Sequence, residues 1–63
     1  MTLGYFKVGD IVRRKAANPY LDIEVGDMGQ VLAVIHTKLR VYWFRVGHDA
    51  MVEASKQEVV KDD

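Results

Sequence analysis

The chain has 63 residues, enough for one small domain, and 49% hydrophobic against 29% charged residues is the balance of a globular protein. It contains no cysteine, which excludes disulfide bonds and cysteine zinc sites and fits the reducing cytoplasm. Nine basic and nine acidic residues give a formal net charge of zero, which disfavours binding to a phosphate backbone without excluding it.

Residues 11–15 predict the first strand, which follows a Gly-Asp turn and opens on β-branched side chains. Val12 should face the core, and Arg13 and Lys15 should face solvent. Arg14 lies near the end of the strand, where we expect its charged head to reach water.

Residues 16–25 lack clean periodicity and predict a long loop. The Asn-Pro pair within it is a turn signal, because proline pushes the preceding residue away from helical dihedral angles. Three apolar side chains of this loop are expected to fold back over one end of the domain: Tyr20, Leu21 and Ile23.

A glycine-cornered strand follows the loop. Gly26 and Gly29 predict a sharp corner and then a place where other atoms approach the backbone closely. Val31 and Val34 are both expected to face inward, which strict two-residue alternation does not allow. We therefore expect a bulge or strong bend near residues 32–33.

Residues 36–38 predict a turn, and residues 39–44 predict a strand with the only tryptophan of the chain. Alternation places Val41 and Trp43 on one face of this strand, which we assign to the core. The opposite face then holds Arg40, Tyr42 and Phe44.

The remaining elements are a turn over 46–49, a fourth strand over 50–54, one helical turn over 55–58, a last strand over 59–60 and a solvated tail over 61–63. Val52 of the fourth strand is expected to face inward. Ser55 would cap the helical turn, because Glu58 follows at the spacing of a capping box.

The chain therefore reads as a Val-Gly-Asp-x-Val opening, a long loop, Gly-x-x-Gly-x-Val, a Val-x-Trp strand, and a single turn before Glu-Val-Val. This layout, over about residues 6–60, resembles the Src-homology-3-like small barrels, a group that includes short phage and bacterial proteins. The resemblance implies an all-β fold, a five-stranded antiparallel barrel with one short helical turn before the last strand, in a single domain over 1–63. The chain also resembles the KOW motif, whose modules bind RNA or proteins, through Gly9, Asp10, Gly29 and Val31.

No set of residues amounts to a catalytic site. Ser55 and two predicted turn histidines, His36 and His48, would have to converge in a pocket, and a barrel this small is filled by its own side chains. The histidines also lack the spacing of metal ligands. We expect no enzyme activity, no cofactor and no metal, and neither a targeting signal nor a membrane-spanning segment.

The aromatic residues give the leading functional hypothesis. Exposed aromatic rings beside an arginine, as expected for Tyr42 and Phe44 beside Arg40, are typical of protein interfaces and of base-stacking surfaces. We expect a module that binds a protein partner, or itself as a homodimer; otherwise Phe44 is covered by the loop or the N-terminal segment. The candidate binding residues are Arg13, Lys15, Tyr20, Arg40, Tyr42 and Phe44.

Nucleic-acid binding is the alternative function. Basic residues concentrate in residues 7–15 and 38–45, so the molecule has a positive side if the two segments share a face. The other interpretation is an ordinary surface of mixed charge. A nucleic-acid site would use Arg13, Arg14, Lys15, Arg40 and Tyr42.

Overall fold

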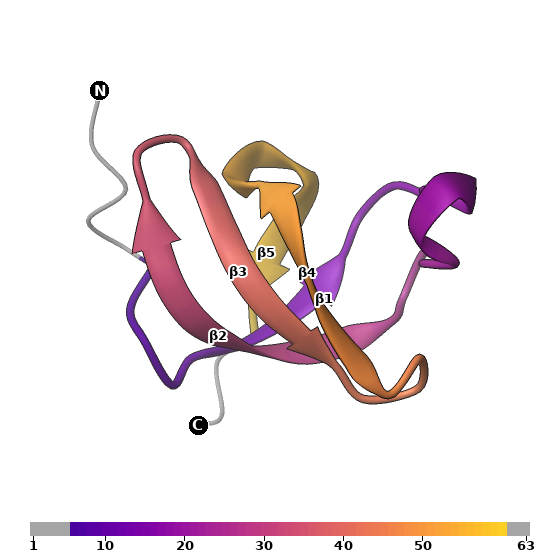
Figure 1. Ribbon diagram of the computed structural model, residues 1–63, viewed down its shortest axis with the longest axis horizontal. Helices are drawn as coiled ribbons and strands as arrows, with labels where there is room; N and C mark the ends of the chain where they lie inside the picture. The colour runs from indigo at the N-terminus through magenta and orange to yellow at the C-terminus, as the bar shows by residue number, and fades with distance from the viewer. Residues whose placement is uncertain (1–5, 61–63) are drawn as a thin grey trace.

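The computed structural model describes residues 6–60, so the tail predicted over 61–63 lies outside the described residues. Five antiparallel strands form one sheet in this part of the chain (Figure 1). The strands are β1 (Ile11–Arg14), β2 (Met28–Ile35), β3 (Lys38–Trp43), β4 (His48–Glu53) and β5 (Gln57–Val59). Two short 3-10 turns, η1 (Pro19–Leu21) and η2 (Ala54–Lys56), lie in the same part of the chain.

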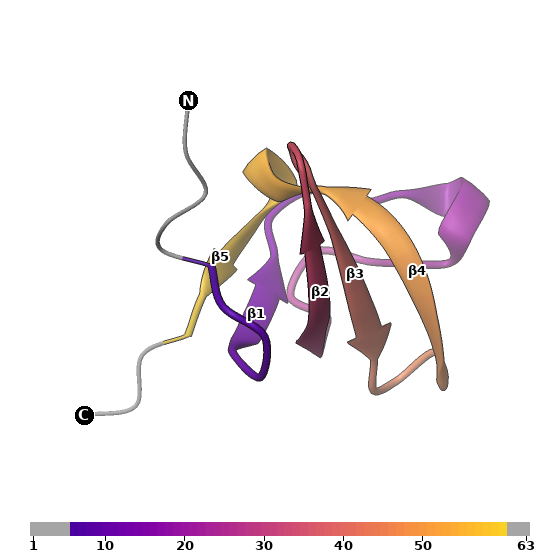
Figure 2. The same ribbon diagram turned by 60° about the vertical axis from the view of Figure 1, so that its left-hand side comes forward.

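The strands lie side by side in the order β4-β3-β2-β1-β5, as Figure 2 shows. The turn η2 leads from β4, at one edge of the sheet, directly into β5, at the other edge. The predicted all-β, five-stranded antiparallel fold with a short helical turn before the last strand is confirmed. The barrel stays a prediction, because no hydrogen-bonded ladder joins β4 to β5 among the described strands.

A bulge in β2 lets two valines face the interior from one strand. The pairing register with β3 shifts between Val31 and Ala33, which leaves Leu32 as an extra residue on β2. Val31 is fully buried before the bulge, and Val34 packs against the core after it, opposite Leu39. The bulge predicted near residues 32–33 is confirmed.

Gly29 lies where β3 packs closely against the backbone of β2. A Cβ atom at Gly29 would lie 2.5 Å from the carbonyl oxygen of Tyr42 and 2.6 Å from Cγ1 of Val41. Any side chain would therefore push the two strands apart, and the expected close approach at Gly29 is confirmed. The missing side chain leaves room for Trp43, which pairs with Gly29 across the ladder and is fully buried.

The core is a cluster of nine buried apolar side chains: Phe6, Val12, Ile23, Val31, Leu39, Val41, Trp43, Val52 and Ala54. Each strand position expected to face inward is therefore buried or packed against this cluster. Ile23 and Leu21 fold back onto the core as predicted. Tyr20 does not, because the η1 turn directs its side chain outward and leaves it 96% exposed.

Arg14 departs from the prediction that its head reaches water. It lies on the same inward-facing row of β1 as Val12, and only 5% of the residue is exposed. Its guanidinium is held inside by the carbonyl oxygen of Ala16 and by the side chain of Gln57. A charged side chain is thus buried because the chain supplies hydrogen-bond acceptors for it.

The predicted capping box at Ser55 is wrong. The η2 turn begins at Ala54, its N-cap is Glu53, and no side chain caps it. Glu58 belongs to β5 and accepts hydrogen bonds from Arg13 instead. The predicted turn over 46–49 is also displaced, because β4 already begins at His48.

Candidate functional site

The outer face of β3 carries the aromatic pair singled out in the sequence. Burial alternates strictly along Lys38–Trp43, with every second side chain exposed. Tyr42 is 39% exposed, and Phe44, the residue after the strand, is 49% exposed. The two predicted faces are therefore correct, and the described segments leave Phe44 uncovered.

Four large apolar side chains gather on this face, and we call them the outer patch: Met28, Tyr42, Phe44 and Met51. The Tyr42 and Phe44 ring centroids lie 6.0 Å apart, with the rings tilted by 59°. The backbone N–H of Phe44 donates to the carbonyl oxygen of Met28, which brings β2 alongside. Met51 extends the patch onto β4, opposite Arg40 in the ladder.

Each of the two methionines is more than a third exposed, and both were missed in the sequence analysis. Met28 precedes a glycine, and Met51 lies in a segment whose alternation is weak. The signal that could have found them is the pairing register, since cross-strand neighbours share a face of the sheet.

Two exposed ion pairs lie on the same face. Nη1 of Arg40 lies 2.7 Å from Oδ2 of Asp49, and Nη2 of Arg13 lies 2.7 Å from Oε2 of Glu58. The hydrogen bond from Arg40 holds the pKa of Asp49 below its ordinary value. Exposed pairs of this kind add little to the stability of a fold, because solvent screens them. Their main effect is electrostatic, because both arginines of the face are neutralised by their own chain.

The candidate residues fall into two groups. Arg40, Tyr42 and Phe44 lie together, and Arg13 lies beside the outer patch because it pairs with Met28 across the ladder. Tyr20 is separate, on η1, which stands to one side of the sheet (Figure 1).

Lys15 also lies away from the outer patch. It follows the end of β1, and its backbone N–H donates to the carbonyl oxygen of Lys56. Of the six candidate binding residues, Tyr20 and Lys15 therefore lie apart from the outer patch.

A metal site and a membrane-spanning helix are not found in the described residues. Within residues 6–60, no three side chains of the His, Asp and Glu type lie close enough together to hold a metal ion. No helix in this range has the length and apolar character needed to cross a membrane. Comparison of the chain with protein-family models, with curated proteins and with solved structures found no match. The site is therefore argued from its geometry alone.

Proposed function

We propose that the protein is a non-enzymatic interaction module whose outer patch binds a second copy of the chain. The observation that supports this is the outer patch itself, four apolar side chains on one face of the sheet that are each 37% to 49% exposed. Single exposed apolar residues are ordinary, whereas contiguous ones mark surfaces that bind other proteins. Aromatic residues and methionine are also enriched at the cores of such interfaces.

The charges of the face favour a second copy as the partner. Arg40 with Asp49 and Arg13 with Glu58 contribute equal numbers of positive and negative charges. A twofold axis brings one patch against an identical patch, and a face without net charge can stack on itself without repulsion. Because these two ion pairs leave no excess charge, they favour neither an acidic nor a basic partner.

The small size of the chain also favours self-association. Each partner of a stable complex typically buries about 800 Å², which is roughly a fifth of the 4293 Å² of accessible surface. A core built from so few residues is marginal, and a small chain without disulfide bonds gains stability by association. Dimerisation through the outer patch would cover four of the nine large apolar side chains that are exposed among the described residues.

Sedimentation velocity from micromolar to millimolar concentration tests the proposal. We expect the sedimentation coefficient to rise toward that of a dimer, and the Tyr42→Ser/Phe44→Ser double variant to stay monomeric. The matched control is Tyr20→Ser, which removes an aromatic ring that is more exposed but lies outside the outer patch. A wild-type protein that is strictly monomeric at millimolar concentration contradicts the proposal, as does equal association of the double variant and the control.

Nucleic-acid binding is less well supported. Of the residues that it would use, Arg13 and Arg40 are paired with carboxylates, and Arg14 is buried. Binding to phosphates should weaken steeply with salt. An NMR titration with short RNA and DNA pools at two salt concentrations tests it, and the alternative predicts chemical shift changes on the Tyr42 face that disappear at high salt.

A further inference from the structure

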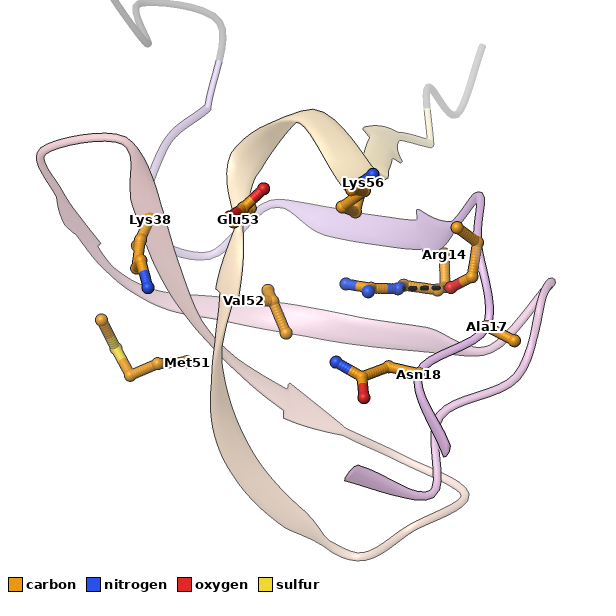
Figure 3. A pocket seen from close by; sticks show the side chains of 9 residues that line it. Arg14, Ala17, Asn18, Lys38, Met51, Val52, Glu53 and Lys56 are labelled. Atoms are coloured by element: carbon orange, nitrogen blue, oxygen red, sulfur yellow. Dashed lines mark hydrogen bonds between the residues drawn. The ribbon is translucent and has the colours of Figure 1, made fainter. Parts of the chain in front are cut away.

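A pocket of about 380 Å³ lies between β4, η2 and the loop that follows β1. Five polar side chains line it, from β1, the loop after β1, β3, β4 and η2 in turn: Arg14, Asn18, Lys38, Glu53 and Lys56. Figure 3 shows Arg14 reaching across the pocket from β1 toward Val52. The proposed function makes no use of these five residues, although Met51 of the outer patch also lines the pocket.

Arg14 enters the pocket with unused hydrogen-bond donors. Its Nε donates to the carbonyl oxygen of Ala16 at 2.6 Å, and its Nη1 donates to Oε1 of Gln57 at 3.0 Å. A guanidinium has five N–H groups, so three of them have no acceptor among the described residues. Only 5% of the residue is exposed, so these groups meet water or a ligand through the pocket that Arg14 lines.

The positive charge of Arg14 is also incompletely balanced. None of the described carboxylates forms an ion pair with it. Burial lowers the pKa of Arg14, and the negative charge of Glu53 opposes this effect only in part. Lys38 and Lys56 line the same pocket, so three cations face one carboxylate there, in a chain whose formal net charge is zero.

Two amide side chains hold the pocket in shape. Gln57 accepts from Arg14 and donates through Nε2 to the carbonyl oxygen of Glu53, which fixes the guanidinium relative to η2. Oδ1 of Asn18 accepts the backbone N–H of Tyr20 at 3.1 Å. This bond turns the NH₂ group of Asn18 toward the pocket, where it is a further donor (Figure 3).

We propose that this pocket binds an oxyanion, the phosphate or carboxylate group of a small molecule. The planar guanidinium of Arg14 presents parallel N–H groups that match two oxygens of such a group. Lys38 and Lys56 supply charge from the rim, and Asn18 supplies a neutral donor. The oxyanion would take up the free donors of Arg14 and balance its buried charge.

The test is an NMR titration of the ¹⁵N-labelled full chain with inorganic phosphate and, separately, with acetate, at ionic strength held constant with chloride. We expect saturable shifts of the Arg14 Nε–H resonance and of the backbone amides of Asn18 and Lys56. Saturation by phosphate alone assigns a phosphate group, and saturation by acetate alone assigns a carboxylate; either result supports the site. Shifts that chloride reproduces overturn it.

Variants at the rim keep the test independent of folding, because replacement of the buried Arg14 could unfold the chain. Lys38→Gln and Lys56→Gln should each weaken binding severalfold. Lys7→Gln, at a lysine that is also exposed but does not line the pocket, should leave binding unchanged. Equal affinity in all three variants overturns the proposal. None of them replaces a residue of the outer patch, although Met51 of the patch also lines the pocket. Sedimentation velocity on the same variants shows whether dimerisation and anion binding fail separately.

Discussion

Arg45 forms a bidentate ion pair with Asp27. Its Nε lies 2.8 Å from Oδ1, and its Nη2 lies 2.7 Å from Oδ2. The same Nη2 donates to the carbonyl oxygen of Asp22 at 2.6 Å, and Asp27 also accepts the backbone N–H of Glu24. Arg45 lies in the turn after β3, so one side chain ties this turn to the end of the long loop before β2. Such two-armed pairs have defined geometry as well as charge.

This pair predicts an acid-sensitive part of the stability. The hydrogen bonds from Arg45, and next the one from the Glu24 backbone, lower the pKa of Asp27 to about 2. A carboxylate whose pKa is lowered in the folded state adds stability above its unfolded pKa, and this stability is lost as pH falls from about 4 to about 2. Urea unfolding across this interval should show that the free energy of unfolding falls less steeply with decreasing pH for Asp27→Asn than for wild type.

Asp22→Asn is the control for this prediction. Asp22 lies in the same loop but accepts a hydrogen bond from Arg45 only through its backbone carbonyl oxygen, which asparagine retains, and its charge acts on Arg45 less than that of Asp27. Its left-handed backbone, with φ of 62°, is also one that asparagine adopts readily. The free energy of unfolding of the control should depend on pH as it does in wild type. If this dependence weakened equally in both variants, a specific role for Asp27 would be contradicted.

The two neighbouring aromatic residues of β3 should respond very differently to truncation. Trp43 is fully buried and Tyr42 is 39% exposed. We expect Trp43→Ala to cost about 3–5 kcal/mol, enough to unfold most of a marginal domain, and Tyr42→Ser to cost less than about 1 kcal/mol. Circular dichroism during thermal unfolding measures both. A larger loss for Tyr42→Ser than for Trp43→Ala would mean that the faces of β3 are reversed.

Gly29→Ala tests the tight crossing of β2 and β3. The added methyl group would meet the carbonyl oxygen of Tyr42 and a methyl group of Val41, and the backbone oxygen cannot rotate away. We expect a loss of about 1–3 kcal/mol in the free energy of unfolding, as for overpacked sites. Gln30→Ala, at the next and exposed position, should change it by no more than about 0.5 kcal/mol. Equal effects at the two positions would show that β2 can move away from β3.

Adjacent residues of β5 offer a comparison between a buried and an exposed link to β1. Gln57→Leu removes the acceptor of Arg14 inside the protein and should cost about 1–3 kcal/mol, because a buried donor is left unsatisfied. Glu58→Gln breaks the exposed ion pair with Arg13 and should cost less than about 1 kcal/mol. Urea unfolding of both variants measures the two losses of stability. A larger loss for Glu58→Gln than for Gln57→Leu would contradict a structural role for the buried pair.

The features that the sequence predicted are those with a local signature. Alternation along 39–44 identified Val41 and Trp43 as buried, and the spacing of Val31 and Val34 required a bulge, because no straight strand directs both inward. The outer position of Tyr42 followed from the same alternation. These inferences need only neighbouring residues and the pleat of a strand.

The features that were missed depend on distant parts of the chain. Arg14 looked like a surface residue, because nothing within β1 indicates that Gln57, 43 residues later, accepts its hydrogen bond. Lys38 and Lys56 become neighbours of the same pocket only after η2 turns the chain from β4 into β5. The misplaced cap at Ser55 has a similar cause, since pairing with β1 draws Gln57 and Glu58 into a strand.

The extra residue at Leu32 also fixes how β2 aligns with β3. Before the bulge, odd-numbered residues of β2 such as Val31 face the interior. After it, even-numbered residues such as Val34 do. A slip of the hairpin by a single step would turn hydrophobic side chains out and their neighbours in throughout both halves. The bulge at Leu32 therefore specifies a single pairing register for the β2–β3 hairpin.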